Sequence, residues 1–321
     1  MASRPWEREA LGLEPVFIVG DARSGTTLLY RSLQHHASFA PSHGFNLAES
    51  HAMRLLMRLF GPGDVTKNAL AHFMLSLEPL AEVAADIAPL ARRRKIVRRI
   101  FSRGKLPRPA FWRSAGEHHV VRRYFLEAHR RRGATRLVEK TPTHTNWVPH
   151  LKIAFPKASF IFMTRHPLDV LSSYWKRYRN EGEMSSWANV KPDEFSARWE
   201  RVTRRALTFA KTEGRFLLVR YEELTADPEP TLRKILDHVG EPFDDACLLR
   251  GDNEDKIKPG VKAVLLRGDP HMLSSVIENT KRWDEYVDRA TAEAVERRLR
   301  ETMTLVGYEP RTNPVTATTS D

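Results

Sequence analysis

Cysteine is almost absent from this chain of 321 residues, in which Cys247 is the only one. A single cysteine excludes an internal disulfide framework and any metal site built from several thiolates. The cysteine content therefore gives no reason to expect an oxidising compartment, and we expect a cytoplasmic protein.

Long apolar runs are missing as well. Six charged, histidine or proline residues interrupt the most apolar stretch, residues 69–91: His72, Glu78, Pro79, Glu82, Asp86 and Pro89. A membrane-spanning helix needs about 20 consecutive, mostly apolar residues. The first 15 residues contain three glutamates and no apolar run, which is atypical of a signal or transit peptide. We therefore expect a soluble protein.

Positive charge is what the chain has in excess. Its 52 lysines and arginines outnumber its 40 aspartates and glutamates, giving a formal net charge of +12. Such an excess is typical of proteins that bind nucleic acid, anionic lipid or a phosphorylated ligand. Two clusters stand out: Arg92, Arg93, Arg94, Lys95, Arg98, Arg99, Arg103 and Lys105, and then Arg130, Arg131 and Arg132. Both clusters can be solvated helix faces, or the first can contact a membrane peripherally.

Short strands rich in β-branched residues alternate with amphipathic helices. We predict strands over 15–20, 135–139, 159–164 and 216–221, and helices over 26–36, 167–178, 230–239 and 285–306. This alternation predicts an α/β fold with a central parallel sheet of about five strands, covered by helices on both faces. The stretch between the first helix and residue 135 is longer than a crossover needs, so we predict a helical insertion over residues 53–132.

A glycine-bounded loop follows the first predicted strand. Gly20 and Gly25 are separated by four residues, and two threonines open the helix that follows. Backbone N–H groups of such a loop and the positive end of the helix dipole attract a phosphate. The spacing is close to that of nucleoside-triphosphate loops, but Thr26 replaces the required lysine and Arg23 supplies a cation earlier. This difference disfavours an ATPase, a GTPase or a kinase and favours another nucleotide with a 5′-phosphate.

Two segments resemble motifs of one enzyme family. Phe17 to Leu28 resembles the 5′-phosphosulfate loop of sulfotransferases that use 3′-phosphoadenosine 5′-phosphosulfate (PAPS), and residues 160–173 resemble their 3′-phosphate motif. The resemblance implies that Arg165, at a strand end, and Ser173, about two helical turns later, bind the 3′-phosphate. It implies that the loop binds the 5′ end of the nucleotide through Arg23, Ser24, Gly25, Thr26 and Thr27.

Three further segments extend this resemblance. Glu139 to His144 is similar to the Glu-Lys-(Ser/Thr)-Pro motif of bacterial and tyrosyl-protein sulfotransferases, and Lys281-Arg282-Trp283 to a late basic-tryptophan element. Residues 220–224 resemble a segment whose tyrosine, here Tyr221, lies near the adenine. The resemblance implies a single sulfotransferase domain over 1–321 with a P-loop-like, three-layer fold. Residues 53–132 would then form a lid that binds the acceptor.

The resemblance also implies a reaction. A sulfuryl group passes from PAPS to a hydroxyl or amine acceptor, adenosine 3′,5′-bisphosphate is the product, and no metal is needed. Negative charge gathers on the leaving bisphosphate, where we place the cations of Arg23 and Lys140. The acceptor must lose a proton, and Glu49 and His51 rank ahead of His144 as candidate general bases.

Other aspects of the function stay open at this point. The acceptor can be a small molecule, a lipid or a carrier-bound metabolite. A P-loop kinase and a non-catalytic polyanion-binding protein are the alternative functions. We expect no specific nucleic-acid partner, and the sequence leaves the oligomeric state open.

Overall fold

Four parallel strands form the central sheet. The computed structural model describes residues 5–39, 121–123, 125–130, 135–181, 190–248 and 283–312. For residues 177–181 it describes the backbone alone. The strands are β1 (Val16–Gly20), β2 (Val138–Lys140), β3 (Ser159–Thr164) and β4 (Phe216–Arg220), in the order β2-β1-β3-β4. Every predicted strand is confirmed, whereas the predicted number of about five exceeds the four in the described part of the chain.

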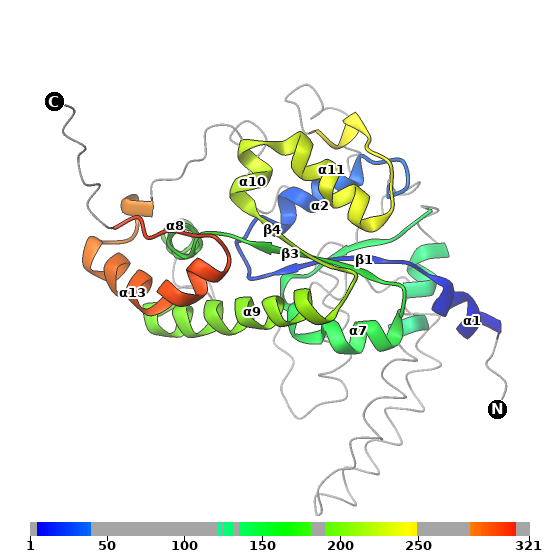
Figure 1. Ribbon diagram of the computed structural model, residues 1–321, viewed down its shortest axis with the longest axis horizontal. Helices are drawn as coiled ribbons and strands as arrows, with labels where there is room; N and C mark the ends of the chain where they lie inside the picture. The colour runs from blue at the N-terminus through cyan, green and yellow to red at the C-terminus, as the bar shows by residue number, and fades with distance from the viewer. Residues whose placement is uncertain are drawn as a thin grey trace, which may run out of the picture.

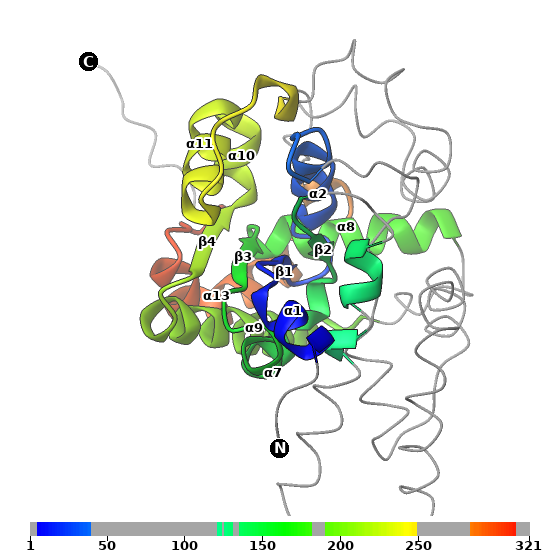
Figure 2. The same ribbon diagram turned by 90° about the vertical axis from the view of Figure 1, so that its right-hand side faces the viewer.

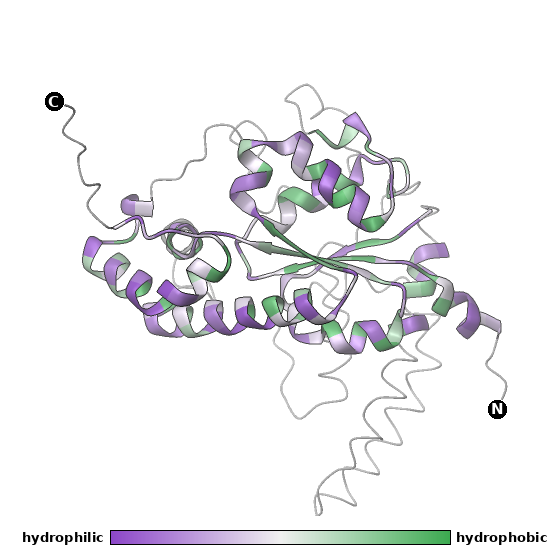
Figure 3. Ribbon diagram, in the orientation of Figure 1, coloured by the Kyte–Doolittle hydropathy of each residue, from purple (hydrophilic) through white to green (hydrophobic). Residues whose placement is uncertain are grey.

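The two faces of β1 are buried against different clusters. Val16 and Ile18 contribute to one hydrophobic cluster, and Phe17 and Val19 to the other. Successive side chains of a strand point to opposite faces, so an unbroken apolar run places apolar groups on both. Figure 3 shows the strands in the green of hydrophobic residues, while the helices mix green with purple. The sheet is therefore the middle layer of three.

Helices form the other two layers (Figure 1). One face is covered by α2 (Thr26–Gln34), α10 (Tyr221–Ala226) and α11 (Pro228–Val239). The other face is covered by α7 (Val148–Ala154), by the helical residues 121–123 and 125–130, and by α9 (Pro192–Thr212). Two further helices, α8 (Pro167–Glu181) and α13 (Arg289–Leu305), pack with α9 beyond the sheet. The P-loop-like, three-layer α/β fold predicted from the sequence is confirmed.

Short elements complete the described chain. They are the helix α1 (Pro5–Gly12) and the 3-10 turns η1 (Pro142–Trp147), η3 (Asp245–Cys247) and η6 (Trp283–Glu285). Of the predicted insertion, only 121–123 and 125–130 are described, and they are helical. No helix in the described ranges combines the length and the apolar composition needed to cross a bilayer.

Local chemistry sets the ends of the longer helices. In α9 the first turn carries Pro192 and two acidic residues, which suit the positive end of a helix dipole. Before α13, the Asp288 carboxylate accepts a hydrogen bond from the N–H of Thr291, so this helix begins at Arg289. At the end of α11, Gly240 adopts a φ of 77°, the left-handed conformation typical of a helix C-cap.

All four strands run in one direction, so their carboxyl ends lie at the same edge of the sheet (Figures 1 and 2). The helix after β1 lies on one face of the sheet, and the helices between β3 and β4 lie on the other side. Ligands of open α/β sheets bind at the carboxyl edge between two such neighbouring strands. The fold therefore predicts a ligand site in the segments that follow Gly20 of β1 and Thr164 of β3.

Candidate active site

The loop after β1 has an unusual backbone. Arg23 has a φ of 73° and Gly25 a φ of 86°, and α2 begins directly afterwards at Thr26. Left-handed residues in such a loop turn neighbouring N–H groups toward a common point, where an anion can bind. Arg23 is the only non-glycine residue with a positive φ in the described part of the chain. Strain of this kind occurs preferentially where a site requires it.

Ser24, between these two residues, is 1% exposed. Its Oγ has no hydrogen-bond partner among the described residues. A buried hydroxyl without a partner is costly, and most such groups are satisfied by something. A phosphate oxygen at the start of α2 would supply the missing acceptor. The loop predicted from the sequence as an anion site therefore contains a donor that fits one.

Neighbouring elements fix the first residue of this loop. The Thr145 hydroxyl accepts a hydrogen bond from the Gly20 N–H at 3.0 Å. A Cβ at Gly20 would lie 2.5 Å from the Met163 carbonyl oxygen, so only glycine allows β1 to end this close to β3. Sequence reasoning missed Thr145, because a threonine in a 3-10 turn gives no signal of a contact with residue 20.

An ion pair fixes the second residue. The Asp21 carboxylate contacts Arg198 of α9 at 3.2 Å and 3.3 Å, and its Oδ1 accepts the N–H of Ala22 at 3.0 Å. Burial raises the pKa of Asp21, while the Arg198 charge opposes that rise. The Arg198 guanidinium also lies 4.8 Å from the centre of the Tyr174 ring. Asp21 and Arg198 were not predicted to be functional, and they connect the loop to the opposite helical layer.

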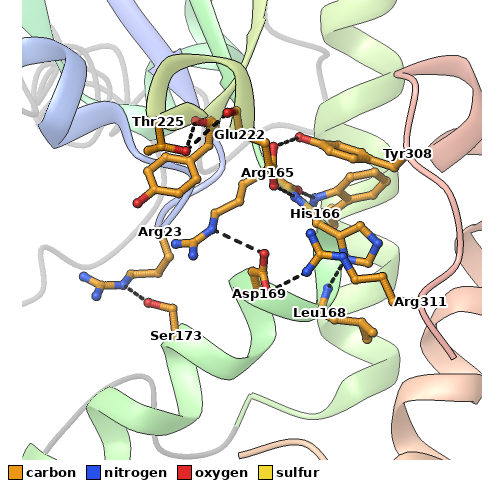
Figure 4. A network of polar contacts seen from close by, with 12 residues as sticks. Arg23, Arg165, His166, Leu168, Asp169, Ser173, Glu222, Thr225, Tyr308 and Arg311 are labelled. Atoms are coloured by element: carbon orange, nitrogen blue, oxygen red, sulfur yellow. Dashed lines mark hydrogen bonds and ion pairs between the residues drawn. The ribbon is translucent and has the colours of Figure 1, made fainter. Parts of the chain in front are cut away.

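The structure brings together two residues that the sequence assigned to different phosphates. The Arg23 Nε donates a hydrogen bond to the Ser173 Oγ at 2.9 Å (Figure 4). Arg23 comes from the loop after β1, and Ser173 lies on α8, the helix after β3. The two proposed phosphate sites are therefore adjacent, as binding one nucleotide requires.

Tyr221 lies between the loop and Arg165. A Cβ at Gly25 would clash with the Tyr221 Cδ2, so the phenol ring packs directly on this glycine. The Arg165 guanidinium lies 4.2 Å from the centre of the same ring. Burial raises the pKa of the Tyr221 phenol, and the Arg165 charge opposes that rise. The predicted nucleotide residues Gly25, Tyr221 and Arg165 thus form one continuous set of contacts.

Arg165 itself is 5% exposed. Its Nε has no hydrogen-bond partner in the described chain, although Asp169 Oδ2 lies 3.9 Å away. Its carbonyl oxygen accepts a hydrogen bond from Trp199 Nε1, and the next residue, His166, donates its N–H to Glu222 at 2.9 Å. A buried guanidinium with an unused donor, held in place through its backbone, is suited to bind an anion.

Lys140 and His144 follow β2. Lys140 is buried and pairs in register with Ile18 of β1, which places it beside the strand that leads to the loop. His144 is fully buried, and its Nδ1 lies 3.0 Å from Glu139 Oε2. The other oxygen of Glu139 accepts a hydrogen bond from the Thr141 hydroxyl at 2.5 Å.

The remaining predicted residues have different outcomes. Thr26 and Thr27 are the first two residues of α2. Glu49, His51 and the basic cluster over 92–105 lie outside the described residues. In the ranges that the structure describes, no three histidine, cysteine or acidic side chains are grouped so that they could hold a metal ion.

Known proteins resemble the chain in sequence. A family model described as the sulfotransferase family matches residues 15–245. Two relatives are the omega-hydroxy-beta-dihydromenaquinone-9 sulfotransferases Stf3 of Mycobacterium bovis (strain ATCC BAA-935 / AF2122/97) and Mycobacterium tuberculosis (strain CDC 1551 / Oshkosh). Each is 29% identical over 254 residues, and the match covers 70% of this chain and 62% of the relative. The chain therefore spans less than two thirds of these relatives.

Solved structures resemble it in fold. The sulfotransferase domain of the Synechococcus PCC 7002 olefin synthase superposes with a TM-score of 0.56 at 21% identity, covering 92% of this chain and 96% of the domain. The sulfotransferase domain of the curacin biosynthetic pathway gives a TM-score of 0.57 at 19% identity, covering 92% and 98%. At these identities the likeness shows a shared fold.

Proposed function

The chain belongs to the sulfotransferase family, and from this premise we propose that it transfers a sulfuryl group from PAPS to a hydroxyl or amine acceptor. One observation carries the proposal. Ser24 Oγ and Arg165 Nε are buried donors that have no hydrogen-bond partner in the described ranges, and they lie where the sequence predicts the 5′ and 3′ phosphate groups. Tyr221 contacts both segments and connects the two. An ATP site would need a lysine at Thr26, and the sequence has none there.

The proposed roles of the residues follow from where charge develops. When bound, PAPS supplies a sulfuryl group, and the bond between its sulfur and the bridging oxygen breaks as the acceptor bond forms. Arg23 and Lys140 stabilise the negative charge that gathers on the leaving bisphosphate. Ser24, Thr26 and Thr27 bind its 5′-phosphate.

A general base takes the proton of the acceptor. We keep Glu49 and His51 ahead of His144 for this role. The ring of His144 is fully buried, and Glu139 holds it through Nδ1. Its Nε2 has no hydrogen-bond partner among the described residues, so His144 stays a candidate after Glu49 and His51. Variants of Glu49, His51 and His144, each to alanine, rank the three by their loss of turnover.

Calorimetry with three nucleotides tests the proposed function. Adenosine 3′,5′-bisphosphate should bind at least about tenfold more tightly than AMP, because Arg165 and Ser173 contact only the 3′-phosphate. The Arg165→Ala variant should lose that advantage, and Arg233→Ala, which removes an exposed arginine on α11, should keep it. Equal affinities for the bisphosphate and AMP in the unchanged protein would contradict the proposal, and a preference for ATP would favour a kinase.

The acceptor is proposed to bind within residues 53–132. The mycobacterial relatives are named for a dihydromenaquinone that carries an omega-hydroxyl group, so lipid hydroxyls are the first acceptor class to screen. Small molecules and carrier-bound metabolites are the next classes. We propose a cytoplasmic location with a peripheral membrane contact through the basic cluster over 92–105.

Neutralising Arg94, Arg98 and Arg99 together tests the role of this cluster. If the cluster faces an anionic acceptor or membrane, the apparent KM for the acceptor rises and its salt dependence flattens, while PAPS affinity stays unchanged. If these arginines form a solvated helix face, neither quantity changes. Wild-type kinetics across a salt series would therefore overturn the proposed contact.

A further inference from the structure

A carboxylate lies beside the arginine that we assign to the 3′-phosphate. Asp169, in the first turn of α8, is 6% exposed, and its Oδ2 lies 3.9 Å from Arg165 Nε (Figure 4). This distance is too long for a hydrogen bond. The Arg165 Nε accordingly has no hydrogen-bond partner among the described residues.

A negative charge at this place opposes phosphate binding in two ways. A buried carboxylate repels an incoming phosphate, because the low dielectric of the interior screens the repulsion poorly. It also competes with the phosphate for Arg165, since arginine forms paired hydrogen bonds with carboxylates and phosphates alike. A site that binds the 3′-phosphate must therefore neutralise Asp169 and hold it back.

Arg311 is positioned to neutralise Asp169 and to hold it away from Arg165. Its Nη1 donates to Asp169 Oδ1 at 2.9 Å, on the carboxylate oxygen that does not face Arg165. In Figure 4 the Arg311 side chain reaches Asp169 from the chain that follows α13, while Arg165 approaches from the opposite side. The carboxylate is thus hydrogen-bonded to Arg311 and only close to Arg165.

The segment that carries Arg311 is fastened on both sides. Glu296 of α13 accepts hydrogen bonds from the N–H of Arg311 at 2.8 Å and from the N–H of Thr312 at 3.0 Å. Upstream, the Tyr308 hydroxyl donates to Glu222 Oε2 at 2.8 Å. These hydrogen bonds therefore hold the backbone of Arg311 in place beside Asp169.

We propose that Arg311 is a positioning residue for recognition of the 3′-phosphate. By binding Asp169, it neutralises that carboxylate and prevents it from closing on Arg165, whose guanidinium stays free for the phosphate. The inference rests on the proposed function, in which Arg165 binds the 3′-phosphate of PAPS. Arg311 acts through Asp169 and does not contact the nucleotide.

The test measures the ratio of the AMP Kd to the adenosine 3′,5′-bisphosphate Kd by calorimetry. Arg311→Ala should lower this ratio at least about fivefold and leave the AMP Kd unchanged. Arg311→Gln, which keeps a donor but has no charge, should lower it as well. Adding Asp169→Asn to Arg311→Ala should restore the ratio to within about twofold of the unchanged protein.

Arg289→Ala is the matched control. Arg289 also contacts this segment, through Thr312 O at 3.2 Å, but no contact joins it to Asp169 in the described structure. Its loss should leave the ratio unchanged. A rescue by Asp169→Asn is expected only if Arg311 acts on that carboxylate, because a direct ligand of the phosphate would stay missing in the double variant.

Three outcomes would overturn the inference. An unchanged ratio in Arg311→Ala and Arg311→Gln would show that Asp169 needs no neutralisation. A ratio that stays low in the double variant would make Arg311 a direct phosphate ligand or a purely structural residue. A ratio of one in the unchanged protein would instead contradict the proposed function, and the inference would fall with it.

Discussion

Arg23 donates a hydrogen bond to the hydroxyl of Ser173 across 2.9 Å, which joins the loop after β1 to α8. In the proposed function these two residues bind the two phosphates that one ribose carries, Arg23 the 5′-phosphate and Ser173 the 3′-phosphate. The contact therefore brings the two phosphate sites next to each other before the nucleotide binds. The backbone of Arg23 is also strained, because this residue has a φ of 73°.

Replacing Arg23 with glycine should lower the activity without lowering the stability. Arg23→Gly removes a left-handed conformation that costs a side-chain-bearing residue about 1 kcal/mol, so the free energy of unfolding should stay equal or rise. Turnover should fall about a hundredfold, because the variant lacks the cation at the leaving group. Urea unfolding and steady-state kinetics measure the two effects. Arg23→Ala is the control: it should lose the same turnover without gaining stability, and equal stability of both variants would contradict the strain.

A methyl group at Gly25 should disrupt nucleotide binding. Its Cβ would clash with Tyr221 Cδ2, and the φ of 86° is unfavourable for alanine. Gly25→Ala should therefore displace Tyr221, weaken binding of adenosine 3′,5′-bisphosphate at least about tenfold, and destabilise the fold by about 1 to 3 kcal/mol. Gly214→Ala is a matched control, because nothing lies within 4 Å of its Cβ. Calorimetric binding unchanged in Gly25→Ala would show that the ring moves aside freely.

The sequence predicted the strands because their apolar, β-branched runs are local. Element ends were predicted less well, since they depend on distant partners. The predicted strand over 135–139 begins instead at Val138, because the backbone N–H of Arg136 donates to the carbonyl of Ser38 and so takes no part in pairing with β1. The predicted helix over 26–36 ends at Gln34, and the ring of His36 accepts the N–H of Ser38 beyond it.

The residues of the site divide in the same way, into those that local sequence predicts and those that depend on distant partners. The glycines and hydroxyls of the loop are adjacent in sequence, so its anion-binding character was predictable. Arg198 and Arg311 contact Asp21 and Asp169 only through the packing of α9 and of the chain after α13. Among many surface arginines, nothing in their sequence surroundings distinguishes these two.

Lys140 should act mainly in the transition state. Its charge is most useful when the bond to the leaving oxygen breaks, so Lys140→Ala should lower kcat by a larger factor than it weakens binding of adenosine 3′,5′-bisphosphate. Lys152→Ala, which removes a lysine paired with Glu213, should change neither quantity. If kcat and affinity fall by the same factor in Lys140→Ala, the lysine serves binding alone.

Removal of divalent metal should leave the reaction rate unchanged. The proposed stabilisation of the leaving group comes from arginine and lysine side chains, which need no ion. The measurement is the initial rate with and without EDTA, with a magnesium-dependent kinase as the positive control. A rate that EDTA abolishes and magnesium restores would favour the kinase interpretation.

Acid should destabilise the fold through His166. Burial, together with the nearby charges of Arg311 and Arg165, lowers the pKa of His166 to about 3. The unfolded chain binds a proton near pH 6.5, so the stability from His166 is complete above that pH and is lost as the pH falls toward 3. The loss approaches about 1.4 kcal/mol per pH unit.

Urea unfolding between pH 7.5 and 4.5 measures this contribution as the difference between the unchanged protein and His166→Gln. The stability advantage of the histidine should shrink steadily below pH 6.5. Other titrating groups are common to both proteins and cancel in the difference. Parallel stability curves would mean that His166 binds protons equally in the folded and the unfolded chain, which would contradict a lowered pKa.

The position of β1 in the sheet determines when the site can form. Val16 pairs with Val138 on one side and with Ser159 on the other, so the central strand leaves the ribosome long before either neighbour. Contacts this distant in sequence slow folding and leave apolar segments exposed in the nascent chain. The anion loop follows β1, yet Ser173 and Tyr221 contact it only after β3 and β4 have been made. Nucleotide binding therefore becomes possible only after the ribosome has made β4 and Tyr221.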